Sequence, residues 1–444
     1  MKNDSDRKQK TNAEVRKQIN QLAGAMLQEL IRENNGDNVI FSPLSVYTML
    51  SILADTTAGK TLKKITGVLG EEKEFNQNVR GLSDILQEVA EGGMYSSANA
   101  VIVREDVQQN LTPQYEKRLR ELFDGRLFTT DNIAVHLDTW GRQSTKSMIP
   151  SIYDDSMKEM MLCMINACSF VAGWQNQYEE GDIQNEDFHN ADQTVSRVKM
   201  LHSYETTYVE NETFTGFVKP YEDQDFCYLV LLPKHRKLSI ENLKGELNFA
   251  ELICGVDNTF ANVLMPEFNC TTDTDLTSIM KKLGICTVFT PQADFSPLSS
   301  EWLRVDSIKH KAKIEVDRKG TKAAAVTCSD FVCGAMPTVF PEEKLVLVNR
   351  PFIYAVVHNE TGVPVFLGAV NHLDTPEGET DLMTNQEKLD VCQPIYERIC
   401  DRVLDEDGIL RGGYDRSLWH RIIEKYRKLD LDGLNKIAAQ VCRK

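Results

Sequence analysis

The apolar positions near the start of the chain recur at helical spacing. Between residues 13 and 31 they are Val15, Ile19, Leu22, Met26, Leu27 and Leu30. Steps of three and four residues place such side chains on one face, so the pattern predicts an amphipathic α-helix that ends at Asn34-Asn35-Gly36. A second helix is predicted to begin after Ser42-Pro43, because proline is tolerated in a first helical turn. The polar residues 1–14 predict a flexible tail.

Five short apolar segments predict buried strands. They are rich in β-branched and aromatic residues and are bounded by turn signals, which is typical of strands in a sheet core. These segments are residues 98–103, 226–232, 260–265, 345–348 and 352–357. Helices and strands are interspersed without a regular strand–helix–strand period. The pattern therefore favours a mixed α+β fold over a doubly wound parallel sheet.

The pattern changes after Leu373. Residues 374–379 (DTPEGE) predict a linker. Three helical patterns follow it, at Ile395/Ile399/Val403, Leu418/Ile422/Tyr426 and Leu434/Ile437/Val441. We therefore expect a main domain over residues 15–373 and a linker with a helical extension over 374–444. The apolar stripes of the extension can pack on one another or on the main domain, or residues 376–444 can dock a partner or form an oligomer.

Composition and charge narrow the class of protein. Hydrophobic residues make up 41% of the 444 residues, which excludes wholesale disorder. A net charge of -16 argues against sequence-independent nucleic-acid binding. No apolar run is long enough to span a membrane, and the polar N-terminus has no secretory signal, so we expect cytoplasmic residence, with an extracellular location as the alternative. The 11 cysteines lack Cys-x-x-Cys spacing, which favours reduced thiols over disulfides or a zinc site.

The common catalytic motifs are missing. Residues 58–61 (AGKT) look like the end of a phosphate-binding loop, but position 54 is Ala where that motif needs Gly. The sequence has no Gly-x-Ser-x-Gly and no His-Glu-x-x-His, and its eight histidines are dispersed. We therefore expect no enzyme activity, no metal and no cofactor, and favour a binding or inhibitory protein.

The most informative segment is residues 316–331 (VDRKGTKAAAVTCSDF). Read with a period of two, one face is neutral and nearly all small, and holds Thr321, Ala323, Ala325, Thr327, Ser329 and Phe331. The other face carries both charges, Lys322 and Asp330. A strand of this pattern can bury one face against a tight surface. The segment has few large apolar side chains and fits an exposed loop equally well, which suggests a switch between two states. On these residues alone, however, the pattern favours an alanine-rich surface loop or helix end.

Ordered motifs along residues 15–373 resemble the serpin family. They are NVIFSPLSV (38–46), INA (165–167) with Gly173-Trp174, EDFH (186–189), MPEF (265–268), ADFS (293–296), IKHKA (308–312), Gly320-Thr321 with the alanine run, NRPF (349–352) and VFLG (365–368). The resemblance implies three mixed β-sheets, eight or nine helices and an exposed reactive-centre loop. It also implies a suicide inhibitor. A target protease cuts the loop and forms an acyl-enzyme, and the loop then inserts into the main sheet and traps the protease in a covalent complex.

The resemblance also assigns residues to the moving parts. It places Ser42, Ser45, Asn166 and His310 beneath the part of the sheet that must open, and Trp174 at the top, where insertion begins. The hinge and inserting loop are Gly320, Thr321, Ala323, Ala324, Ala325 and Thr327. All inward positions of that loop lack charge, which favours an active inhibitor over a non-inhibitory serpin that binds or stores a ligand.

Two residues near the hinge depart from the family pattern with their charges reversed. Arg318 stands where the family usually has Glu, and Glu267 stands where it usually has Lys. An ion pair could survive with its partners exchanged. We therefore predict that Glu267 and Arg318 face each other where the loop enters the sheet.

The scissile bond follows from the family's usual loop spacing. Counting from Gly320 places the cut after Gly334 and before Ala335, with Cys333 and Met336 left open as alternatives. Small residues suit an elastase-like or subtilisin-like serine protease. Cys333 leaves a cysteine-protease target open.

Overall fold

The computed structural model describes six long stretches of the chain and parts of the C-terminal extension. The stretches are residues 2–34, 36–70, 72–130, 133–234, 247–321 and 342–375. In the extension the described residues are 393–396, 398–400, 402–403, 418, 421–422, 425–426 and 431–441. The α-helices in these parts are α1 (Lys2–Glu33), α2 (Pro43–Asp55), α3 (Gly59–Leu69), α4 (Phe75–Ala90), α5 (Glu105–Gln108), α6 (Tyr115–Phe123), α7 (Ile133–Ser144), α8 (Phe249–Leu252), α9 (Thr277–Lys282) and α12 (Leu431–Val441).

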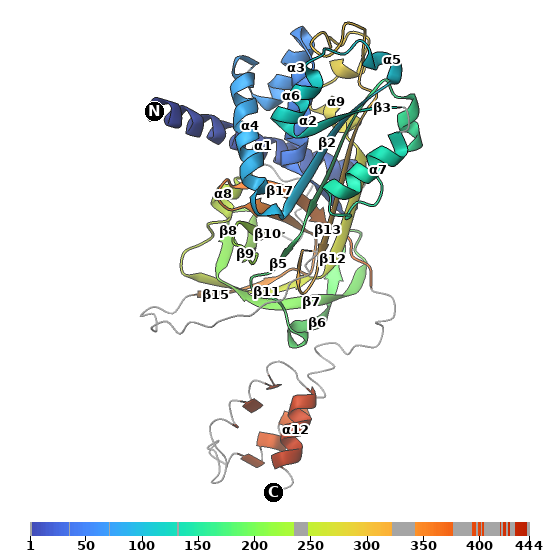
Figure 1. Cartoon of the computed structure of the whole chain (residues 1–444). Helices are drawn as coiled ribbons and strands as arrows, with labels where there is room; N and C mark the ends of the chain where they lie inside the picture. The colour runs from blue at the N-terminus through green and yellow to red at the C-terminus, as the bar shows by residue number, and fades with distance from the viewer. Residues whose placement is uncertain are drawn as a thin grey trace.

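The strands form three sheets, in a mixed α+β arrangement (Figure 1). The main sheet has the order β3-β2-β4-β13-β14-β5, with β12 also paired to β13. Its strands are β2 (Tyr95–Val103), β3 (Gly125–Thr129), β4 (Leu162–Phe170), β5 (Ala172–Gly173), β12 (Phe268–Asp275), β13 (Ser307–Val316) and β14 (Gly320–Thr321).

The second and third sheets lie beside the main sheet. The second has the order β1-β17-β16-β10-β9-β8 and consists of β1 (Val39–Phe41), β8 (Thr207–Glu210), β9 (Phe214–Pro220), β10 (Phe226–Pro233), β16 (Phe352–His358) and β17 (Val363–Val370). The third has the order β15-β11-β7-β6 and consists of β6 (Ile183–His189), β7 (Val195–Glu205), β11 (Thr259–Pro266) and β15 (Glu342–Leu347). Three sheets in an α+β fold confirm the predicted fold class.

The local predictions for strands and for the second helix are confirmed. The five predicted segments correspond to β2, β10, β11, β15 and β16. The second helix begins at Pro43, and Ser42 is its N-cap, with a side chain that accepts a hydrogen bond from the backbone N–H of Ser45. Such a cap satisfies a donor that the helix itself leaves unpaired.

The predicted flexible tail is instead helical. α1 begins at Lys2, so residues 2–14 continue the amphipathic helix toward the N-terminus. Neighbouring α4 explains the extension. The Lys8 ammonium lies 3.2 Å from the Asp84 carboxylate, and the helix packs so closely that a Cβ on Gly81 would lie 3.0 Å from the Thr11 side chain. Contacts between helices thus outweigh the polar composition of this segment.

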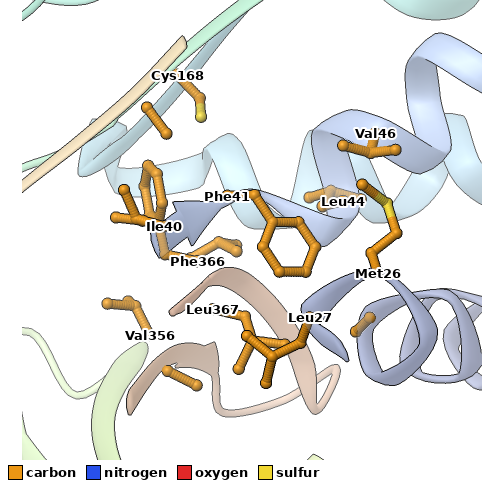
Figure 2. Packing of buried hydrophobic residues seen from close by; sticks show 14 of the residues in the cluster. Met26, Leu27, Ile40, Phe41, Leu44, Val46, Cys168, Val356, Phe366 and Leu367 are labelled. Carbon is orange, nitrogen blue, oxygen red and sulfur yellow. The ribbon is translucent and has the colours of Figure 1, made fainter. Parts of the chain in front are cut away.

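Each face of the main sheet packs against its own hydrophobic cluster. On one face, alternate side chains of β2 and β4 pack with the buried side of α7, which contributes Ile133, Leu137 and Trp140 (Figure 1). On the other face, residues such as Met164, Cys168 and Phe170 of β4 join the large core. Figure 2 shows part of that core, where Phe41 and Leu44 pack between Met26 and Leu27 of α1 and Phe366 and Leu367 of β17. The two faces of β4 therefore belong to different cores, and any movement of β4 affects both.

The described residues of the C-terminal extension form a separate hydrophobic cluster. It unites the three predicted stripes, with Ile395, Ile399, Val403, Ile422, Leu434, Ile437 and Val441 buried and Leu418 and Tyr426 packed against them. The rings of Tyr396 and Tyr426 stack at a centroid distance of 3.9 Å. The stripes thus pack on one another, whereas a docking or oligomerising role for the extension stays a prediction.

None of the described helices combines the length and the apolarity that crossing a membrane requires. Within the same described residues, no group of three His, Cys, Asp or Glu side chains is arranged to hold a metal ion.

Candidate loop-insertion site

The main sheet contains a seam, by which we mean the line between β4 and β13 and its continuation between β5 and β13. At one end β4 and β13 pair directly with each other, and at the other end β14 lies between β13 and β5. Residues 163–168 of β4 pair in parallel with residues 307–312 of β13. Further along, the two-residue strand β14 lies between β13 and β5. There Thr321 is opposite Val316 on one side and Ala172 on the other. β14 runs antiparallel to both neighbours, so its two residues occupy this end of the seam.

A tight turn connects β13 to β14. The Asp317 carboxylate accepts hydrogen bonds from the backbone N–H groups of Lys319 (2.7 Å) and Gly320 (3.1 Å). The Asp317 N–H in turn donates to the carbonyl oxygen of Gly320 at 3.0 Å. A side chain that bonds the backbone two or three residues ahead stabilises a turn. The turn directs the chain after Gly320 into the seam.

Glu267 and Arg318 lie together at this turn, but their contact differs from the predicted one. The Glu267 carboxylate accepts a hydrogen bond from the backbone N–H of Arg318 at 3.0 Å. Partial burial raises the pKa of Glu267 above its usual value. In the described part of the chain, the contact between the two residues is thus made by the Arg318 backbone rather than by an exchanged side-chain ion pair. A backbone donor is supplied whatever side chain occupies position 318, which explains why sequence reasoning about charge missed it.

Trp174 packs directly under the turn. Its side chain is fully buried, and its indole N–H donates to the carbonyl oxygen of Asp317 at 2.8 Å. Its backbone N–H donates to the carbonyl oxygen of Lys319 at 3.0 Å. The indole stacks on the ring of Tyr221 at a centroid distance of 4.8 Å. The Tyr221 hydroxyl lies 2.6 Å from the Thr321 hydroxyl. These contacts fix both ends of the turn and orient Thr321 into the core.

A buried ion pair lies behind Trp174. The Lys219 ammonium is 2.7 Å from the Glu205 carboxylate, and their side chains are 2% and 6% exposed. The ammonium also lies 4.4 Å from the ring centroid of Tyr178, whose backbone N–H donates to the Arg318 carbonyl at 3.0 Å. We call Trp174, Tyr178, Glu205, Lys219 and Tyr221 the hinge cluster.

A second buried network crosses the closed part of the seam. His310 on β13 and Asn166 on β4 are opposite each other, and the His310 Nδ1 lies 3.0 Å from the Asn166 Oδ1. The Ser42 backbone N–H donates to the His310 Nε2 at 3.0 Å. Since Nε2 accepts, the neutral ring carries its proton on Nδ1 and donates it to Asn166. Burial without a counter-charge lowers the pKa of His310 to about 3, so the ring is neutral at physiological pH.

The network continues from Asn166 to neighbouring elements. The Asn166 amide donates to the Ser97 hydroxyl and to the Asn99 carbonyl oxygen on β2, both at 3.0 Å. The Tyr95 hydroxyl lies 2.7 Å from the Ser45 hydroxyl and 3.1 Å from that of Ser42. We call Ser42, Ser45, Tyr95, Asn166 and His310 the seam network. It joins β2, β4, β13 and the start of α2, so opening the seam breaks its central bond between His310 and Asn166.

The predicted site residues thus separate into three groups. Ser42, Ser45, Asn166 and His310 come together in the seam network. Trp174, Glu267, Arg318, Gly320 and Thr321 surround the turn. The others lie outside the described residues, and they are Ala323, Ala324, Ala325, Thr327, Cys333, Gly334, Ala335 and Met336.

Sequence reasoning missed five residues that complete these clusters. Tyr95 begins β2 three residues before the predicted strand, Tyr221 follows β9, and Tyr178 lies four residues after Trp174, so all three read as ordinary core aromatics. Lys219 and Glu205 read as surface charges. One signal was present for Lys219, which lies next to Pro220 in an otherwise apolar stretch (FVKPY, 217–221). Residues distant in sequence provide partners for all five, so spacing alone could not find them.

The comparisons with known proteins agree with this geometry. A family model described as "Serpin (serine protease inhibitor)" matches residues 17–373. Plasminogen activator inhibitor 1 of Bos taurus is 27% identical over 369 residues, covering 78% of this chain and 89% of its own length. Alpha-1-antiproteinase 2 of Equus caballus is 24% identical over 364 residues, covering 79% and 85%.

A solved structure also matches. The native-state structure of a thermophilic serpin, tengpin, superimposes with a TM-score of 0.70 at 26% identity, covering 79% of this chain and 93% of tengpin. The family model covers residues 17–373, which is most of the chain. The chain therefore belongs to the serpin family of serine protease inhibitors.

Proposed function

We propose that this protein is a suicide-type inhibitor of a serine protease with small-residue specificity. The protease cuts the loop that follows Thr321 and is acylated by it, and the cut loop then extends β14 down the seam before the acyl-enzyme is hydrolysed. As a member of a family of protease inhibitors, the protein is an inhibitor rather than an enzyme. The target protease is its partner, in a covalent complex.

The register of β14 carries this proposal. Thr321 lies opposite Val316 and Ala172, which flank it on the two sides. Because β14 is antiparallel to both neighbours, six residues forward from Thr321 correspond to six residues back from Val316 and from Ala172. Thr327 would then lie opposite His310 and Asn166, which already face each other across the seam. A strand that continues from β14 therefore fits both edges of the seam without a shift of register. Such a strand requires that β4 separate from β13 along residues 163–168 and 307–312.

The side chains of the loop match the seam that they would enter. In the continued register, Ala323 would lie between Ile314 and Phe170. Ala325 would lie between Ala312 and Cys168, and all four of these neighbours are buried. Thr327 instead meets the polar pair His310 and Asn166. Small apolar groups thus face the apolar part of the core, and a hydroxyl faces the seam network. Thr321, the first inward residue, is fully buried, which supports the inward parity of the residues that follow it at intervals of two.

The energy of insertion comes from new ladder hydrogen bonds. About ten inserted residues, each gaining a net of about 1 kcal/mol, provide on the order of 10 kcal/mol. Opening the seam breaks the backbone ladder between residues 163–168 and 307–312 as well as the bonds of the seam network, but the inserted strand pairs with both edges, so the broken ladder is replaced and one further ladder is gained. The intact loop cannot collect it, because its far end is tied to β15, which is paired with β11 in the third sheet.

The residues at the predicted cut support the choice of target. Gly334, Ala335 and the alternatives Cys333 and Met336 include no basic side chain, which disfavours a trypsin-like protease. Small residues suit the shallow first pocket of an elastase-like or subtilisin-like enzyme. The neutral inward face supports inhibition over a role as a binding or storage protein.

An SDS-resistant adduct tests the proposal directly. The full chain is mixed with pancreatic-type elastase, with subtilisin and with a papain-like cysteine protease, and each mixture is boiled and run on a denaturing gel. We expect a band at the summed mass of inhibitor and serine protease, and mass spectrometry should place the cut between residues 333 and 336. An adduct with papain alone would move the target to the cysteine proteases. Cleavage by all three without an adduct would exclude inhibition by trapping.

A further inference from the structure

The buried pair of Lys219 and Glu205 has no role in the insertion step described above. Lys219 is on β9 of the second sheet, and Glu205 is the last residue of β7 in the third sheet, so the pair connects two sheets. The Ser203 hydroxyl donates to the Glu205 Oε1 at 2.7 Å and lies 3.2 Å from the Tyr178 hydroxyl. A buried ion pair carries a large desolvation cost, and an apolar pair of similar volume often serves stability as well or better. Its presence here calls for a reason beyond stability.

The position of the Lys219 ammonium suggests that reason. It lies 4.4 Å from the ring centroid of Tyr178 and 5.6 Å from that of Trp174. A cation at this range is attracted to the faces of aromatic rings, and more strongly when water is excluded. Glu205 holds the ammonium from the other side at 2.7 Å. The cation is thus held in one place and acts on both rings together.

Those two aromatic residues hold the turn that begins the inserted strand. Trp174 donates to the carbonyl oxygens of Asp317 (2.8 Å) and Lys319 (3.0 Å), and Tyr178 donates to that of Arg318 (3.0 Å). Three consecutive carbonyl groups are therefore bonded by the two residues that the ammonium contacts. A shift of either aromatic residue would move the backbone that leads into Gly320 and Thr321.

We propose that Lys219, oriented by Glu205, is a positioning residue for loop insertion. It fixes Trp174 and Tyr178 beneath residues 317–319, so that β14 stays aligned between β13 and β5 and the cleaved loop extends in register from its first residue. This inference rests on the proposed inhibitory function. After cleavage, insertion competes with deacylation of the protease. Loss of the ammonium lets the turn move, delays the first steps of insertion and increases the fraction of inhibitor that is released as cleaved product.

The test measures how cleaved inhibitor divides between trapped complex and released product. The variants are Lys219→Met, Glu205→Gln and the double substitution. Each is assayed with subtilisin at a temperature well below the thermal midpoint of that variant. The stoichiometry of inhibition is expected to rise at least threefold in each, while the rate at which the loop is first cut stays within twofold of the wild type. The double variant leaves no uncompensated buried charge, so it decides the result if a single variant fails to fold. Lys219→Arg keeps a cation over the rings and should retain more of the wild-type behaviour than Lys219→Met.

A matched control comes from a second Lys–Glu pair, between Lys234, just after β10, and Glu210 at the end of β8. The Lys234 ammonium lies 2.6 Å from the Glu210 carboxylate, but its side chain is 29% exposed and it is not part of the hinge cluster. Lys234→Met should leave the stoichiometry unchanged. If the wild type forms no adduct, the proposed function itself fails. If the wild type forms the adduct and the double variant matches its stoichiometry, the proposed function stands and the positioning role of Lys219 is wrong.

Discussion

The seam network and the hinge cluster are both buried and polar, but only the hinge cluster contains charged side chains. This difference matches their positions, because the seam must open for insertion and the hinge must stay in place. The seam network is neutral, with His310 uncharged and bonded to Asn166 and Ser42. The hinge cluster contains the buried ion pair of Lys219 and Glu205. The first joins β4 to β13, the strands that separate when a new strand enters. The second joins strands of the other two sheets, behind a part of the seam that β14 already occupies.

This contrast has a simple energetic basis. Separating a buried ion pair leaves uncompensated charges and costs several kcal/mol, whereas a neutral hydrogen bond can be exchanged for another at a net cost of about 1 kcal/mol. Neutral groups therefore suit a seam that must open quickly. Charged groups suit a support that must keep its shape while the seam opens. In the proposed mechanism, the hinge cluster holds the turn before β14 in place, and the seam network holds β4 and β13 together until the loop inserts.

The largest expected effect comes from placing a charge on the inward face of the loop. Thr327→Arg would bring an unpaired guanidinium against the neutral seam network, at a cost of several kcal/mol. We expect the adduct with subtilisin to fall at least tenfold and cleaved inhibitor to accumulate instead. The control is Val326→Arg, on the outward face, which should keep most of the adduct. An equal loss of adduct in both variants would refute the assignment of Thr327 to the inward face and Val326 to the outward face.

Removal of His310 should destabilise the native state. His310→Ala leaves the Ser42 N–H without its acceptor and the Asn166 carbonyl oxygen without its donor. Two unsatisfied buried groups should lower the free energy of unfolding by about 2–4 kcal/mol, measured by denaturant unfolding of the intact protein. His372→Ala is the control, because that side chain is 41% exposed. An undiminished stability in the His310 variant would show that the network does not hold the seam.

The same histidine predicts how stability depends on pH. Its folded pKa of about 3 lies below the ordinary value of 6.5, so the unfolded chain binds a proton that the folded state excludes. The stabilising contribution is therefore complete above pH 6.5 and is lost progressively as pH falls toward 3. At pH 5 the loss from this group should be about 2 kcal/mol. His310→Gln should show a shallower fall in the free energy of unfolding over this range; the same slope in both proteins would contradict the assignment.

The smallest expected effect concerns the residue before the hinge. Because Glu267 accepts its hydrogen bond from the backbone of Arg318, Arg318→Ala should change the free energy of unfolding by less than about 0.5 kcal/mol. Glu267→Ala removes the acceptor and should cost about 1 kcal/mol. Thermal unfolding of the two variants separates these cases. A larger loss for Arg318→Ala than for Glu267→Ala would restore the exchanged ion pair that the sequence predicted.

Local patterns were sufficient to predict the strands, the start of the second helix after Ser42-Pro43 and the apolar stripes of the extension, because each depends on residues close in sequence. The resemblance to serpins correctly grouped Asn166 with His310, which are 144 residues apart. It could not find Lys219 and Glu205, since a charged residue reads as exposed until its partner is known. The polarity of residues 1–14 predicted a flexible tail where the chain is helical from Lys2, because α1 packs against α4. The contact between Glu267 and the Arg318 backbone involves no side chain at position 318, so no pattern of residue types encodes it.

The claim that β14 is the start of a strand awaiting its continuation is tested most directly by thermal unfolding before and after the loop is cut. A single nick within residues 322–341 is made with a catalytic amount of a metalloprotease, which forms no acyl-enzyme and so is not trapped, and the midpoints of the intact and nicked chains are compared in the same buffer. If the freed segment fills the seam, its gain on the order of 10 kcal/mol should raise the midpoint by at least about 10 °C. A nicked protein that unfolds at the same temperature as the intact chain would contradict the account.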